Sequence, residues 1–187
     1  MQYYKGFSLY RYSGTIEGSG SGSQTDQAGR TVVDNTYTIA SASQYYMMNV
    51  YAGKDTDGTK VTAWATDGSK EQQYKIQYAG SGQYYIYAVC SGNGGSRVLD
   101  VNRGSNNKID IGDGIDIWQR NDSEAQLFYI VPAGDNKYLF KLAYNSGVIG
   151  ITENKNGAQL TLQQYTGADT QKWYLCDLNA QAVNPAP

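Results

Sequence analysis

The stretch EAQLFYI, at residues 124–130, contains a glutamine, any residue, an aromatic residue, any residue and an aliphatic residue, in that order. The same order occurs in KEQQYKI at residues 70–76 and in DTQKWYL at residues 169–175. The three glutamines lie 54 and 45 residues apart. Such self-similarity at a regular spacing is typical of folds built from repeated units. The sequence therefore predicts three copies of one structural unit.

Short runs rich in Tyr, Ile, Val and Thr fill each copy, and clusters of Gly, Asn, Asp and Ser separate them. Examples are YTIAS at 37–41, YYIYAV at 84–89 and YLFKLAY at 138–144. A recurrence about every 8–12 residues is typical of an all-β sandwich or barrel, and no window keeps a helical period for long. Each copy therefore has four predicted strands.

Three four-stranded units have a natural closed arrangement, in which six strands form a short barrel and six form a cap of three hairpins. This closure leaves no open sheet edge, whereas three blades are too few to close a propeller well. We expect the barrel axis to be filled by one bulky residue from each copy. These residues are Ile39, Ile86 and Phe140.

The closing stretches should serve the fold. Their aromatic residues, Tyr74, Phe128 and Trp173, are predicted to lie in the core. Their glutamines are predicted to hydrogen-bond the backbone within each closing hairpin. A functional site should therefore depend on what differs between the copies.

The repeats cover residues 31–178, which we predict to form one domain. Residues 1–30 form a predicted N-terminal extension that ends in a Gly/Ser-rich linker, GSGSGSQTDQAG at 18–29. Residues 179–187, NAQAVNPAP, are predicted to be a C-terminal tail, either a disordered tail or a cut linker.

The composition of the 187-residue chain excludes several functions. Fifteen Lys and Arg against 17 Asp and Glu leave a net charge of −2, which argues against a nucleic-acid binder. No apolar run reaches membrane-spanning length, so we expect no membrane insertion. Histidine is absent and the two cysteines have no CxxC spacing, so we expect no metal and no cofactor. Cys90 and Cys176 either form a disulfide or are buried thiols, and their expected strands favour free thiols.

The Q-x-aromatic closure, the threefold repeat and the segments VVDNTYTIASA and VLDVNRGS resemble the ricin-B-type lectins, especially their bacterial members. The resemblance covers residues 31–178 and implies an all-β β-trefoil. It also implies a non-catalytic carbohydrate-binding module of a secreted or cell-surface bacterial protein, tethered to other domains outside the cell. The implied partner is a glycan, of galactose type or from a cell-surface or plant polysaccharide.

In that family, an Asp in the LDV stretch and an aromatic residue at the end of the third strand hold the sugar. The second copy matches with Asp100 and with Trp118, eight residues before the closing glutamine. Asp116 lies two residues before Trp118, so strand alternation places both side chains on one face. The position that is often Asn in plant lectins is Ala125 here. The remaining expected members of this carbohydrate site are Asn121 and Gln126.

The first copy is an altered candidate. It keeps the aromatic residue as Trp64 and the glutamine as Gln72, but Asn49 replaces the carboxylate, and Glu71 could supply one from the other side. We expect no site in the third copy, where Gly150 replaces the Asp and Gln163 replaces the aromatic residue.

Two other functions fit the same residues less well. One is a structural or protein-interaction trefoil whose sugar sites have decayed. The other is an enzyme that uses Asp110, Asp113 and Asp116, because glycoside hydrolysis needs only two carboxylates. The segment IDIGDGIDI also resembles a calcium loop but lacks the ligand spacing of an EF-hand. The sequence favours a protein that is not an enzyme.

Overall fold

The computed structural model describes residues 29–178. The predicted N-terminal extension, apart from its last two residues, and the predicted tail at 179–187 lie outside the described residues. Within them, twelve β-strands and three short 3-10 helices follow one another. The strands are β1 (Asn35–Ser41), β2 (Met47–Val50), β3 (Thr59–Trp64), β4 (Gln73–Gly80), β5 (Gln83–Ala88), β6 (Arg97–Val101), β7 (Ile115–Gln119), β8 (Phe128–Pro132), β9 (Lys137–Leu142), β10 (Val148–Ile151), β11 (Leu160–Gln163) and β12 (Trp173–Asp177). The helices are η1 (Tyr51–Gly53), η2 (Lys70–Gln72) and η3 (Asp169–Gln171).

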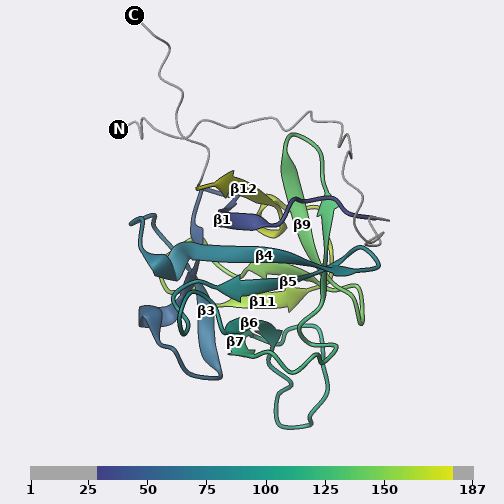
Figure 1. The fold of residues 1–187 in the computed structure, drawn as a ribbon. Helices are drawn as coiled ribbons and strands as arrows, with labels where there is room; N and C mark the ends of the chain where they lie inside the picture. Colours follow the sequence, from purple (N-terminus) through teal and green to yellow (C-terminus); the bar gives the residue numbers. More distant parts are fainter. Residues whose placement is uncertain (1–28, 179–187) are drawn as a thin grey trace, which may run out of the picture.

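The first and fourth strands of each copy form a closed barrel. Antiparallel pairing runs from β1 to β4, β5, β8, β9 and β12, and β12 pairs with β1 again. Figure 1 shows β12, β1 and β4 side by side, although β12 belongs to the third copy and β1 and β4 to the first. This closure leaves the barrel strands without an open edge.

The remaining strands form three hairpins, β2–β3, β6–β7 and β10–β11. Contacts between copies hold the hairpins together as a cap: β3 pairs with β7, and isolated bridges join Thr62 to Gln159 and Gly114 to Thr161. The expected β-trefoil, with six barrel strands and three capping hairpins, is therefore confirmed.

The core contains the residues expected from the repeat. Ile39, Ile86 and Phe140 are fully buried in one hydrophobic cluster. The closing aromatic residues Tyr74, Phe128 and Trp173 are also fully buried there. Trp173 satisfies its indole N–H by donating to the Ile149 carbonyl at 3.0 Å, whereas the Tyr74 hydroxyl has no hydrogen-bond partner among the described residues.

The closing glutamines tie the end of each third strand to the turn that follows. In the first copy, Gln72 Oε1 accepts from the backbone N–H of Asp67 at 3.0 Å, and its Nε2 donates to the Ala65 carbonyl at 2.9 Å. The equivalent backbone partners are Asn121 and Gln119 for Gln126, and Thr166 and Gln164 for Gln171. The repeated glutamine thus has the predicted structural role in all three copies.

Two further features bear on function. Cys90 and Cys176 are partly buried free thiols. Within residues 29–178, no helix has the length and apolar character needed to cross a membrane.

Candidate functional site

The β6–β7 hairpin places two carboxylates side by side. Leu99 and Ile117 are cross-strand partners that point into the core, so the alternate residues point the other way. Asp100 and Asp116 are the next pair in the ladder, and both side chains therefore lie on the outer face. Their exposed fractions are only 8% and 1%, so the pair is almost fully shielded from water.

These carboxylates lie in a pocket of about 370 Å³. Four predicted site residues, Asp100, Asp116, Trp118 and Asn121, line this pocket together. Trp118 is 41% exposed, so part of its ring is free to contact a ligand. We call this cavity the acidic pocket.

Hydrogen bonds leave the acidic pocket with a free acceptor. Asp100 Oδ2 accepts from Gln126 Nε2 at 2.8 Å, and Asp116 Oδ2 accepts from Asn102 Nδ2 at 3.1 Å. Asp116 Oδ1 is buried and has no partner among residues 29–178. A buried acceptor without a donor is unfavourable, so a ligand hydroxyl at this oxygen would be stabilised.

Burial changes the ionisation of the pair. Burial and the neighbouring Asp100 charge raise the pKa of Asp116 to about 7, against a smaller lowering by Asn102. Burial also raises the pKa of Asp100, while the hydrogen bond from Gln126 lowers it. The pocket therefore holds less than two full negative charges near neutral pH.

Gln126 lies beneath the acidic pocket, where it donates a hydrogen bond to Asp100. It is fully buried and does not line the cavity, so it positions the Asp100 carboxylate. Asn121 lines the cavity, but its side-chain oxygen already accepts from the Ser123 N–H at 3.1 Å. Ala125 is fully buried, and its carbonyl accepts from the Val101 N–H at 3.1 Å.

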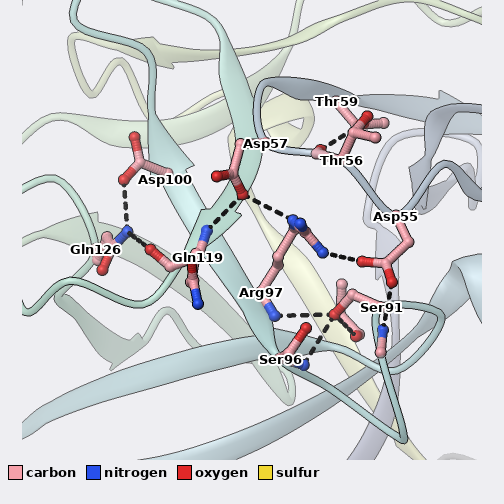
Figure 2. Close-up of polar contacts among 12 residues, drawn as sticks. Asp55, Thr56, Asp57, Thr59, Ser91, Ser96, Arg97, Asp100, Gln119 and Gln126 are labelled. Carbon is pink, nitrogen blue, oxygen red and sulfur yellow. Dashed lines mark hydrogen bonds and ion pairs between the residues drawn. The ribbon is translucent and has the colours of Figure 1, made fainter.

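The loop before β3 is bonded to the β6–β7 hairpin beside the acidic pocket. Figure 2 shows Asp57 of this loop between Arg97 and Gln119, where its Oδ1 accepts from Arg97 Nε at 2.7 Å and from the Gln119 N–H at 2.8 Å. Arg97 also forms an ion pair with Asp55. These bonds fix the first-copy loop against the second copy. The Trp118 ring consequently lies over Gly58, where a Cβ would be 3.7 Å from the ring.

The first-copy residues are arranged differently. Asn49 is buried and donates its side-chain amide to the Val50 carbonyl at 3.0 Å, and Gln72 is also buried. Trp64 lies over Gly157 of the third copy, as Trp118 lies over Gly58. A second pocket, of about 560 Å³, lies over β3, but Asn49, Trp64 and Gln72 are not among its lining residues. The structure does not bring the three predicted residues together around this cavity.

In the third copy a side chain fills the equivalent space. Gln163 lies over Gly150, where a Cβ would be 2.7 Å from Gln163 Cδ. Gln163 Oε1 accepts from Gln171 Nε2 at 3.0 Å, just as Asp100 accepts from Gln126 in the second copy. The amide of Gln163 thus replaces the missing carboxylate.

Sequence reasoning missed four polar residues that line the acidic pocket, Asn102, Arg103, Asn107 and Ser123. They lie in the loops after β6 and β7, where strand alternation does not specify side-chain direction. The position of Asn102, two residues after Asp100, was the available signal. Among the described residues, no group of three or more His, Cys, Asp or Glu side chains could hold a metal ion.

A closed barrel of six strands capped by three hairpins defines a β-trefoil. Residues 24–112 match the profile of the family described as ricin-type beta-trefoil lectin domain-like. The predicted resemblance to the ricin-B-type lectins is thereby confirmed. No curated protein matches this chain.

Solved structures share the fold at low sequence identity. The designed threefold-symmetric protein ThreeFoil has a TM-score of 0.71 and 24% identity over 78% of this chain and 100% of its own. The Rhizoctonia solani agglutinin has a TM-score of 0.68 and 19% identity over 80% of this chain and 99% of its own. An exo-beta-1,3-galactanase from Clostridium thermocellum has a TM-score of 0.70 and 21% identity over 77% of this chain. The match spans only 30% of that galactanase.

Proposed function

We propose that the trefoil is a non-catalytic carbohydrate-binding module that holds a sugar unit in the acidic pocket. A sugar presents pairs of hydroxyl groups and one apolar C–H face. Hydrogen bonds from hydroxyls to a carboxylate are strong because they are charge-assisted. A partly exposed indole ring provides a matching apolar surface.

One observation carries the proposal: two buried carboxylates and a partly exposed tryptophan line one cavity, and a buried oxygen of Asp116 lacks a donor within residues 29–178. In this arrangement Asp100 and Asp116 accept sugar hydroxyls, and Trp118 contacts the C–H face. Asn102 and Asn121 offer further polar groups beside them. The lectin-type family match supports the same assignment.

The test is a glycan array followed by calorimetry with the glycans that bind. Asp100→Asn and Trp118→Ala should each lower the affinity about tenfold or more, the equivalent of one charge-assisted hydrogen bond or one stacking contact. Tyr144→Ala is the matched control, because Tyr144 is an exposed aromatic residue that does not line the pocket. Binding that survives the double substitution of Asp100 and Trp118 contradicts this site.

A structural or protein-interaction trefoil is the second candidate. It is favoured by the third copy, where Gln163 fills the space of the carboxylate. In that case the array shows no glycan binding, and the protein captures a protein partner through another surface. Turnover of any glycan by the purified protein would instead point to an enzyme.

We also propose that the module acts outside the cell or at the cell surface, attached to other domains, and that its parent protein is bacterial. The galactanase supports attachment, because the matching part is under a third of that chain. The expected glycan is of galactose type, or a cell-surface or plant polysaccharide. Detection of the protein only in cytoplasmic fractions of its source would contradict the location.

A further inference from the structure

The cavity over β3 has the features of a binding site for a charged ligand. It has a volume of about 560 Å³ and combines first-copy residues with Gly157 and Gln159 of the third copy. Tyr51 at its edge is 48% exposed, and Thr62 lies on the outer face of β3. We call this cavity the β3 pocket.

The charge of the β3 pocket is positive. Lys54 and Lys60 line it and are both exposed. Lys54 lies 6.0 Å from the centre of the Tyr51 ring, and neither lysine has an ion pair among residues 29–178. The single acidic lining residue, Asp57, is already paired with Arg97. Two ammonium groups are therefore available to an anion.

The two pockets are neighbours on one face of the cap. Lys60 and Asp116 are directly opposed in the β3–β7 ladder, so their side chains project to the same side of the sheet. Lys60 lines the β3 pocket, and Asp116 lines the acidic pocket. The Trp118 ring lies over Gly58, which lines the β3 pocket. A chain of linked sugars that contacts Trp118 can therefore reach both cavities.

We propose that the β3 pocket is a second subsite that takes an anionic sugar unit of the same glycan, one carrying a carboxylate. Lys60 and Lys54 bind the carboxylate, and Tyr51 borders the sugar ring. The acidic pocket is less suited to such a unit, because its two carboxylates would repel it and its lining cation, Arg103, is paired with Glu124. The ligand is thus an acidic oligosaccharide in which a neutral unit and an anionic unit follow one another. This inference rests on the proposed function.

The experiment starts from the neutral oligosaccharide that binds the wild-type protein best on the array. Its analogues, each with one unit oxidised to a uronic acid, are then compared by calorimetry. One analogue should bind about fivefold more tightly than the neutral parent, the range of an exposed ion pair, and raising the salt concentration should reduce this advantage. Backbone NMR signals of Lys60 and Gly157 should shift with that analogue and much less with the neutral parent.

Substitutions separate this inference from the proposed function. The double variant Lys54→Gln/Lys60→Gln should lose the preference for the uronic acid while binding the neutral parent as before. Lys75→Gln on the barrel strand β4 is the charge control and should keep the preference. If no analogue is preferred, or if the preference survives the double variant, the second subsite is wrong while the acidic pocket stands. If no glycan binds at all, both proposals fail.

Discussion

Asp100 and Asp116 occupy directly opposed positions of the β6–β7 ladder, and both carboxylates are buried in one pocket. The Asp100 charge raises the pKa of Asp116, and water cannot screen two buried carboxylates well. The ladder thus forces together two groups that are unstable when both are ionised. The repulsion between these carboxylates destabilises the fold. Such a destabilising pair is expected at a binding site, where a ligand donates hydrogen bonds to the carboxylate oxygens.

Asp116→Asn should reduce the dependence of stability on pH. The pKa of Asp116 is raised in the folded protein to about 7, mainly by burial, so the folded state binds the proton more tightly than the unfolded state does. Stability is therefore highest below the unfolded pKa of about 4 and falls as the pH rises to about 7. The free energy of unfolding should decrease by an amount on the order of a few kcal/mol over this pH range, at about 1.4 kcal/mol per pKa unit. Asp116→Asn should flatten this fall and be more stable than wild type at pH 8.

Urea unfolding between pH 4 and pH 8 measures this effect. Asp135→Asn is a suitable control, because the Asp135 side chain is 91% exposed. An Asp116→Asn variant whose stability falls with pH as steeply as wild type would contradict the assigned pKa.

Gly150→Ala should destabilise the protein by about 1–3 kcal/mol, the usual effect of overpacking. The new Cβ would overlap the Gln163 amide, which is already held by Gln171. Gln163→Ser makes room, so Gly150→Ala should be much less harmful in that background. A double-mutant cycle by thermal unfolding measures the coupling, and simple additivity would show that Gln163 does not fill this space.

Tyr74→Phe should leave stability unchanged or raise it by about 1 kcal/mol, because it removes a buried hydroxyl that has no hydrogen-bond partner in the described part of the chain. Tyr84→Phe is the matched comparison in an equally buried tyrosine. The Tyr84 hydroxyl accepts from the N–H groups of Thr31 and Val32 at 2.7 and 2.9 Å. Its loss should destabilise by about 1–3 kcal/mol. Equal effects of the two substitutions in chemical unfolding would refute the assignment.

Cys90 should react slowly with iodoacetamide in the folded protein. Burial, with a contribution from the Glu71 charge, raises the pKa of this thiol to about 11, so at pH 8 only about one thiol in a thousand is the reactive thiolate. Burial also raises the pKa of Cys176. Mass spectrometry should show little labelling until urea unfolds the chain, and rapid labelling of Cys90 in the native state would contradict this prediction.

The sequence predicts most of the fold because the repeated residues have the same physical role in each copy. Gln72, Gln126 and Gln171 each hold a turn, and the aromatic residue two positions later fills the core. The sequence also predicts that Asp100, Asp116 and Trp118 lie close together. Hairpin pairing and strand alternation are local, so they place these side chains on one face.

The arrangement of the first-copy site was harder to predict from the sequence. Trp64 has the expected position in its strand, yet the cavity nearby is lined by Lys60, Thr62 and third-copy residues instead. Nothing in the local pattern of the first copy specifies how Gly157 and Gln159 approach it.

The sequence by itself thus determined the threefold barrel, its core and the face on which the second-copy carboxylates lie. These follow from periodicity and hydrophobic burial, which are properties of short segments. Only the tertiary structure decided which faces become cavities. The walls of the β3 pocket come from two copies that barrel closure brings together, because Gly157 and Gln159 of the third copy complete a cavity of first-copy residues. Whether a space stays open depends on side-chain volume, and Gln163 closes it over Gly150.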